Sequence, residues 1–240
     1  MATEITRYVI PKRLALVGHG STGKDTIGRL LGKRWGYARV AMGDQIKCRL
    51  RNMRLQEADR FLNWLHCDER LQDCRPGYIA SAESAFRLVI DGGIHPDTED
   101  QEEKAKLRAL FETFGLFIYA DLYRELNRHL VNARRDGGNR CNTRLFLLEE
   151  AHLWKAHGGS IWRLEREWAQ GHPAVPHMEK LATLELDTDG DMFDLRIKTV
   201  EGDIEEQFLA ALRNNQQHIQ SVVPINDCHI IDEAITVAGF

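Results

Sequence analysis

The sequence has few cysteines and no long apolar run. Its 240 residues include five cysteines, an odd number scattered along the chain without a CxxC pair. This pattern argues against a disulfide framework and against paired zinc-binding cysteines. We find no secretory leader and no apolar stretch of about 20 residues, the length needed to cross a bilayer. We therefore expect a reduced, cytoplasmic protein with no membrane partner.

The sequence also lacks a strong charge of either sign. It has 32 Lys and Arg against 36 Asp and Glu, which gives a formal net charge of −4. Such a balance provides no overall attraction to nucleic acid or anionic lipid, but it does not exclude a local basic groove. The composition is 43% hydrophobic, as in globular proteins. The length favours one domain, or one domain with an insertion.

The most informative segment is VGHGSTGKDT, residues 17–26. It has the frame of a phosphate-binding loop, in which a glycine and four residues precede Gly-Lys. In such loops backbone N–H groups converge on phosphate oxygens, and the lysine reaches the outer phosphates. The predicted nucleoside triphosphate site comprises Gly18, Gly20, Ser21, Thr22, Gly23, Lys24, Asp25 and Thr26.

The segments on either side of this motif fit its mechanism. Residues 13–18 are a short apolar run that ends in glycine, which is typical of a buried strand entering a loop. Residues 24–35 carry apolar side chains at helical spacing, and Gly36 suits the end of that helix. The competing interpretation is a glycine-rich turn with an exposed lysine. That interpretation does not explain why a strand and a helix flank the loop.

Asp25 occupies the position where a serine or threonine usually helps to hold magnesium. A carboxylate beside a triphosphate repels it unless a divalent cation lies between them. Magnesium accepts carboxylate ligands directly or through water. Thr26 lies about 100° further round the helix and cannot replace the missing hydroxyl. We therefore expect ATP and Mg²⁺ as cofactors, with Asp25 as the metal-side residue.

The rest of the pattern predicts strands that alternate with helices. We expect further strands at 37–44, 160–167 and 194–200. Predicted helices cover 44–71, 81–88 with Ser81 as the cap, 102–114 ending at Gly115, 143–159, and 203–217 capped by Asp203. Residues 116–135 fit one helix, or a helix that changes near His129 into a short strand. Alternating strands and helices indicate an α/β fold with a parallel sheet and helices on both faces.

The form GxxxxGKDT followed by a helix resembles the phosphate loop of phage-type deoxynucleoside monophosphate kinases, which are P-loop nucleotide kinases. Further segments resemble that family in the same order: VAMGDQIK, LRALFETFG, EEAHLWKAHGGSIWRLER and DLRIKTVEGDIEEQFLAAL. The resemblance covers most of residues 13–219. It implies a three-layer P-loop NTPase-type fold with a helical insertion for acceptor binding. The kinase domain would be 1–219, with its core at 12–45 and 128–219 and the helical region at 46–127, followed by a tail or capping segment at 220–240.

The resemblance also places substrate-binding residues. Asp44 and Lys47 fall in the segment after the second strand, and Arg108 falls in the arginine-bearing helix. These residues would contact the acceptor, with Asp44 orienting it or a magnesium-bound water. Each of the three also has a structural alternative, which for Lys47 is an ordinary surface charge. Asp44 would be a helix N-cap beside Gly43, and Arg108 would lie on a solvated helix face.

The sequence departs from the family at its Asp-Val-Arg-like motif. The candidates are NAR at 132–134 and NTR at 142–144, both with asparagine in place of the acid. We prefer Arg134 or Arg135, because HLV precedes them as a plausible strand. With Arg108, either arginine would clamp the acceptor phosphate, since a guanidinium fits phosphate oxygens in a bidentate manner.

The implied activity is an ATP-dependent transfer of the γ-phosphate to a deoxynucleoside monophosphate, in the host cytoplasm if a phage encodes the chain. One alternative is a kinase that phosphorylates hydroxymethylated pyrimidines within phage DNA. In that case the arginine-rich segments 47–60 and 132–144 would contact the DNA backbone. A second alternative is a P-loop ATPase or switch without a small acceptor. The sequence does not specify which base or sugar the substrate carries, or whether the protein forms a homodimer.

Overall fold

The computed structural model describes residues 2–18, 22–71, 74, 77–143, 145, 147–166 and 190–237. The chain divides into two compact units. The first, which we call the sheet unit, is built from the described parts of Met1–Val40, Asn127–His172 and Thr183–Phe240. The second, which we call the helical unit, is described over Ala41–Leu126. The helical unit covers nearly the same residues as the predicted acceptor-binding region, and its role stays a prediction.

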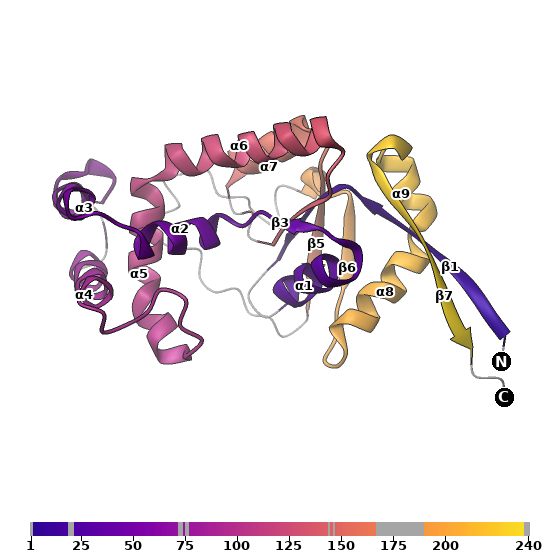
Figure 1. Cartoon of the computed structure of the whole chain (residues 1–240), viewed down its shortest axis with the longest axis horizontal. Coiled ribbons are helices and arrows are strands. Elements are labelled where there is room, and N and C mark those ends of the chain that lie inside the picture. The colour runs from indigo at the N-terminus through magenta and orange to yellow at the C-terminus, as the bar shows by residue number, and fades with distance from the viewer. Residues whose placement is uncertain are drawn as a thin grey trace. The chain divides into compact units, whose positions relative to one another are not determined.

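A five-stranded parallel sheet with the order β3–β4–β2–β5–β6 organises the sheet unit. Its strands are β2 (Arg13–Val17), β3 (Ala38–Arg39), β4 (Arg140–Asn142), β5 (Ser160–Glu165) and β6 (Leu195–Lys198). All five residues of the central strand β2 are buried. A strand covered on both faces reads as such a continuous apolar run. The predicted α/β class and parallel sheet are therefore confirmed (Figure 1).

In the described part of the sheet unit, these strands are connected or covered by helices that include α1 (Lys24–Trp35), α7 (Leu148–Ala156), α8 (Ile204–Asn214) and α9 (Gln216–Val222). The end of α1 is as predicted. Gly36 adopts φ 70° and donates its N–H to Gly32 O, a left-handed cap that glycine enters without strain. The start of α8 is also as predicted, since the Asp203 side chain accepts the N–H of Glu206.

A second sheet pairs β1 (Ala2–Pro11) with β7 (Cys228–Val237) in antiparallel register. Figure 1 shows this ribbon beside α8 and α9. Glu233 of β7 ties the ribbon to α1, because it accepts hydrogen bonds from Arg34 Nη2 at 2.5 Å and Trp35 Nε1 at 2.7 Å. The segment predicted as a tail or capping element is thus, in its described part, a helix end, a turn and a long strand.

The helical unit contains α2 (Met42–Arg51), α3 (Leu55–Cys67), α4 (Tyr78–Ile90), α5 (Gln101–Phe117) and the start of α6 (Tyr119–Asp136). Short 3₁₀ turns lie at Glu69–Leu71 here, and at Gly190–Met192 and Ile225–Asp227 in the sheet unit. Aromatic side chains form the core of the helical unit. The ring centroid of Phe61 lies 5.0 Å from that of Phe86 and 5.2 Å from that of Phe114, in edge-to-face contacts.

Several predicted boundaries are wrong. The strand expected through Asp44 ends at Arg39, and α2 starts at Met42. Ser81 is not a cap but lies inside α4, where its hydroxyl donates to Gly77 O at 2.8 Å. Gly115 does not end α5. A Cβ at this position would lie 2.9 Å from Ile46 Cδ1, so the glycine allows α2 to pack closely on a continuous helix.

Of the two alternatives for residues 116–135, the strand near HLV, residues 129–131, is wrong, and the uninterrupted helix is found from Tyr119 onward. Residues 119–136 form the single helix α6, whose buried residues Leu122, Leu126, Leu130 and Ala133 follow the helical period. Burial of this face stabilises the helix through HLV. Among the described helices, none is long and apolar enough to cross a membrane.

Candidate functional site

Three strand ends converge beside the first turn of α1 in the sheet unit. They are Gly18 after β2, Arg39 at the end of β3 and Thr143 just after β4. Each contacts a residue of that turn, as described below. In a parallel sheet, ligands bind outside the carboxyl ends of the strands, because the connecting loops and helix N-termini face the same edge. This edge of the sheet therefore carries the candidate site.

Two glycines of the predicted loop are required by the geometry. Gly18 has φ 142°, and a Cβ there would lie 2.4 Å from Leu164 O of β5. Gly23 is the N-cap of α1 with φ 92°, and a Cβ there would lie 2.6 Å from Ile204 Cγ2. Both positions exclude a side chain, so the backbone passes close to its neighbours. Gly20 and Ser21 lie outside the described residues.

The side chain of Lys24 bends back toward the loop. Its Nζ donates to Gly18 O at 2.6 Å and to Thr22 Oγ1 at 3.3 Å. Thr22 is fully buried. The hydroxyl of Thr26 accepts a long hydrogen bond of 3.4 Å from Arg29 Nη2. The ammonium group therefore lies among the loop atoms at the N-terminus of α1, where first-turn N–H groups also favour an anion.

The carboxylate of Asp25 has two partners from neighbouring strands. Its Oδ1 accepts the Thr143 hydroxyl at 2.9 Å and lies 3.1 Å from Arg39 Nη2. The Asp25 side chain is 47% exposed and that of Arg39 is 29% exposed, so the ion pair is in contact with solvent. Such a pair neutralises the acid at a position where it would otherwise repel a phosphate. It contributes little to stability.

Thr143 joins β4 to α1 through packing as well as through its hydroxyl. It is fully buried, and a Cβ added to Gly28 would lie 2.5 Å from Thr143 Cγ2. The methyl group therefore occupies the space that the missing side chain of Gly28 leaves on α1. Cys141, the neighbour of this contact on β4, is buried, and loss of hydration raises the pKa of its thiol to about 12. That thiol is a packing group.

The contacts of Asp25 are compatible with the expected role as a magnesium ligand. Magnesium in phosphate sites takes one or two carboxylates, phosphate oxygens and waters, so Asp25 suits it in kind and number. In the described part of the chain, no group of three or more His, Cys, Asp or Glu side chains gathers for a metal. An ion held at Asp25 would share or replace the contact of this carboxylate with Arg39.

The predicted acceptor residues of the helical unit lie on two helices that pack together, α2 and α5. Asp44 is in the first turn of α2 but is not its N-cap, since Ala41 holds that position. Lys47 Nζ lies 5.9 Å from the centroid of the Phe111 ring. Arg108 is exposed, and its charge acts to lower the pKa of Glu112, against the stronger raising effect of burial.

Arg134 and Arg135 do not follow a strand, so this part of the prediction is wrong. Both lie exposed in the last turn of α6. Arg135 Nε pairs with the adjacent Asp136 at 3.0 Å. The strand end that does lie beside α1 belongs to the other candidate segment, NTR, through Thr143. Arg144 lies outside the described residues.

Two residues of the site were missed in the sequence. Arg39 and Thr143 contact Asp25, yet neither belongs to the phosphate-loop motif. Arg39 lies at the carboxyl end of β3, and Thr143 follows β4, the strand between β3 and β2. This rule could have identified them had the short strands β3 and β4 been located correctly.

Comparisons with known proteins add little. No family model matches the chain, and no curated protein matches it. A similar solved structure is the "Crystal structure of TT1252 from Thermus thermophilus", with 19% identity, coverage of 84% of this chain and 96% of that chain, and a TM-score of 0.42. We therefore base the proposed function on the residues of the site and not on this likeness.

Proposed function

We propose that this chain is an ATP-dependent phosphotransferase that transfers the γ-phosphate of ATP to a deoxynucleoside monophosphate on a three-layer P-loop NTPase-type fold. The observation that supports it most is the position of Lys24. Its ammonium group bonds Gly18 O at 2.6 Å and Thr22 Oγ1 at 3.3 Å, directly between β2 and α1. A strand, a glycine-flanked loop and a helix with this lysine are the parts that a phosphate-binding loop needs.

The donor phosphates would exchange one set of partners of Lys24 for a stronger one. The partners of the ammonium group include a neutral carbonyl and a hydroxyl. A hydrogen bond to a phosphate oxygen joins two charged groups and is roughly twice as strong as a neutral one. Gly23 has no side chain to cap the first-turn N–H groups of α1, which therefore remain directed at the same anion.

Asp25 would be the residue on the metal side of the donor. Magnesium, when bound with ATP, neutralises charge on the β- and γ-phosphates. Asp25 would hold the ion directly or through water. Thr143 would fix the orientation of the carboxylate through the 2.9 Å hydrogen bond, and Arg39 would balance its charge before the ion binds.

The acceptor would be bound mainly through arginine. Phosphoryl transfer depends on positioning and on neutralising charge, and a guanidinium group offers paired donors to a phosphate. We propose that Arg108 binds the acceptor phosphate and that Asp44 and Lys47 contact the acceptor. Asp44 would orient the acceptor or a magnesium-bound water. Arg134 and Arg135 remain candidates for the same phosphate. They have less support than Arg108, because the strand expected before them is part of the helix α6.

The activity can be tested with γ-labelled ATP and magnesium against a panel of dNMPs, NMPs and hydroxymethylated DNA. We expect label in one or more dNMPs, and its loss in Lys24→Ala. Lys33→Ala is a matched control, since Lys33 is an exposed lysine in the last turn of the same helix. Label only in DNA would favour the polymer kinase. Labelled phosphate without any labelled acceptor would favour an ATPase. No labelled product of any kind would refute the proposal.

A further inference from the structure

The helical unit contains a pocket of about 610 Å³ that is formed by none of the residues assigned above to phosphoryl transfer. It lies between the turn that joins α2 to α3 and the end of α4 with the segment that follows, residues 91–96. Sites for small organic ligands have volumes of roughly 300–1,000 Å³. The pocket therefore has the size of such a site.

The charge of the pocket has one sign. Three of its twelve lining residues are basic, namely Arg51, Arg54 and His95, and none is acidic. The others are apolar residues and one glycine. A concave apolar surface with a few convergent polar groups is typical of ligand sites, and here every charged group that lines it would attract an anion.

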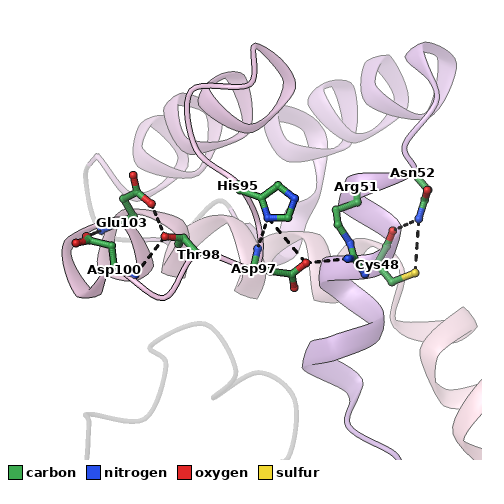
Figure 2. Close-up of polar contacts among 8 residues, drawn as sticks. All are labelled: Cys48, Arg51, Asn52, His95, Asp97, Thr98, Asp100 and Glu103. Carbon is green, nitrogen blue, oxygen red and sulfur yellow. Dashed lines mark hydrogen bonds and ion pairs between the residues drawn. The ribbon is translucent and has the colours of Figure 1, made fainter.

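One of the two arginines is already paired. Arg51 Nη1 lies 2.9 Å from Asp97 Oδ2, a contact that Figure 2 shows between α2 and the segment after α4. Arg54 differs, since its side chain has no ion-pair or hydrogen-bond partner within the residues that the structure describes. It is the N-cap residue of α3 and is exposed at the pocket. Its charge is available to a ligand.

His95 also lines the pocket. Its Nδ1 accepts the backbone N–H of Asp97 at 3.2 Å, as drawn in Figure 2. In the neutral ring the proton is then on Nε2, because one nitrogen donates when the other accepts. The imidazole thus presents an N–H group away from its own backbone contact.

The wall that carries His95 is held by local hydrogen bonds. Gly92 adopts φ 74° after the end of α4, and the N–H groups of Gly93 and Ile94 donate to Leu88 O at 2.8 and 3.1 Å. Further along, Thr98 donates its N–H to His95 O at 3.0 Å and its hydroxyl to Glu103 of α5. The wall is therefore preformed, which lowers the entropy cost of binding.

The apolar part of the pocket is open to solvent at its rim. Leu55 is 80% exposed and Ile90 is 43% exposed, whereas Leu50, Ala58 and Ile94 are buried. A single exposed apolar side chain is common on protein surfaces and does not by itself indicate a binding site. Two exposed apolar side chains beside an unpaired guanidinium group form a surface that is suited to a ligand with an apolar body and an acidic group.

We propose that this pocket binds a small organic anion. The acidic group of the ligand, a phosphate, sulfonate or carboxylate, pairs with Arg54, and its aromatic or aliphatic body covers Leu55 and Ile90. This binding is independent of the phosphoryl transfer proposed above, because Lys24, Asp25 and Arg108 take no part in it.

Two dyes with similar aromatic ring systems but different charges test the proposal. 1-Anilinonaphthalene-8-sulfonate is anionic, and N-phenyl-1-naphthylamine is its neutral counterpart. We expect Arg54→Gln to weaken binding of the sulfonate about fivefold, the effect of losing one solvent-exposed ion pair, and to leave binding of the neutral dye unchanged. Leu55→Ser should weaken both dyes. Dissociation constants come from fluorescence titration of the folded, full-length chain.

The control is Arg60→Gln, which removes an exposed arginine from the same helix α3 outside the pocket. It should bind both dyes like the parent, and so should Lys24→Ala, which separates this test from the kinase assignment. The proposal is overturned if the parent binds no sulfonate dye, or if Arg54→Gln and Arg60→Gln behave alike. Equal loss of both dyes in Arg54→Gln would also overturn it, since the site would then not select an anion.

Discussion

Thr143 donates its hydroxyl to Asp25 Oδ1 at 2.9 Å, which links the end of β4 to the first turn of α1. Arg39 pairs with the same oxygen at 3.1 Å. These two contacts explain how an acid is accommodated beside a loop that is suited to phosphate. The acid is oriented by one strand and neutralised by the next, and it also lies where the positive end of the helix favours it.

Gly28→Ala should destabilise the protein. The added Cβ would lie 2.5 Å from Thr143 Cγ2 in a fully buried contact. Overpacking of this kind typically costs about 1–3 kcal/mol, which exceeds the gain of about 1 kcal/mol from replacing a helical glycine. Urea unfolding of the variant gives the change in the free energy of unfolding.

A second substitution at the same contact should restore the lost stability. Thr143→Ser keeps the hydroxyl for Asp25 but removes the methyl group that meets the new Cβ. The double variant Gly28→Ala, Thr143→Ser should therefore recover most of the stability that Gly28→Ala loses. If the two changes prove additive, the contact between α1 and Thr143 is not as close as the structure shows.

Arg39→Gln should tighten the binding of a divalent cation in the absence of nucleotide. The guanidinium group competes with a metal for Asp25, and a solvent-exposed ion pair is worth up to about 1 kcal/mol, or about fivefold in affinity. Calorimetric titration with Mn²⁺ measures this effect. The gain should disappear in Arg39→Gln, Asp25→Asn. Unchanged Mn²⁺ affinity in Arg39→Gln would argue against Asp25 as a metal ligand.

The contact of Glu233 with α1 should make stability depend on pH. Hydrogen bonding to Arg34 lowers the pKa of Glu233 below its usual value of 4.5, with a smaller contribution from Trp35. An acid whose pKa is lowered on folding stabilises the protein above its unfolded pKa, and this stabilisation is lost as the pH falls through the folded pKa. The difference in unfolding free energy between the parent and Glu233→Gln should therefore be present at pH 7 and shrink below about pH 4.5.

The matched control for that series is Glu201→Gln, since Glu201 is an exposed acid without a partner in the described part of the chain. It should show no such pH-dependent difference. Because Arg34 is 37% exposed, solvent screening limits the effect of Glu233 to at most about 1 kcal/mol. A difference that is constant from pH 7 to pH 3 would contradict the assigned ion pair.

Local signals in the sequence predicted the strand β2, the helix α1 and the start of α8 in the sheet unit. The apolar run of β2, the helical spacing of α1, Gly36 at its end and Asp203 before α8 all act within a few residues, and all are found as predicted. Their success has one physical cause. Capping groups, glycine conformations and apolar periodicity act through neighbours along the chain.

Contacts between distant segments were not predictable in the same way. β1 pairs with β7, where Ala2 lies opposite Val237, and no local pattern specifies that partner. The prediction for Arg134 and Arg135 depended on a strand at HLV, but burial of Leu126 and Leu130 on one face keeps the segment helical. Arg39 and Thr143 join the site only through the order of the strands. That order depends on packing of the whole unit.

The central claim is that the loop at the start of α1 binds the phosphates of ATP through Lys24. Isothermal titration of Mg-ATP into the full chain, into Lys24→Ala and into Lys33→Ala tests it most directly. We predict that the parent and Lys33→Ala bind with similar affinity, and that Lys24→Ala binds at least tenfold more weakly, because a charge-assisted hydrogen bond contributes about 1.5–3 kcal/mol. Absence of heat in the parent, or equal affinity in all three proteins, would contradict the claim.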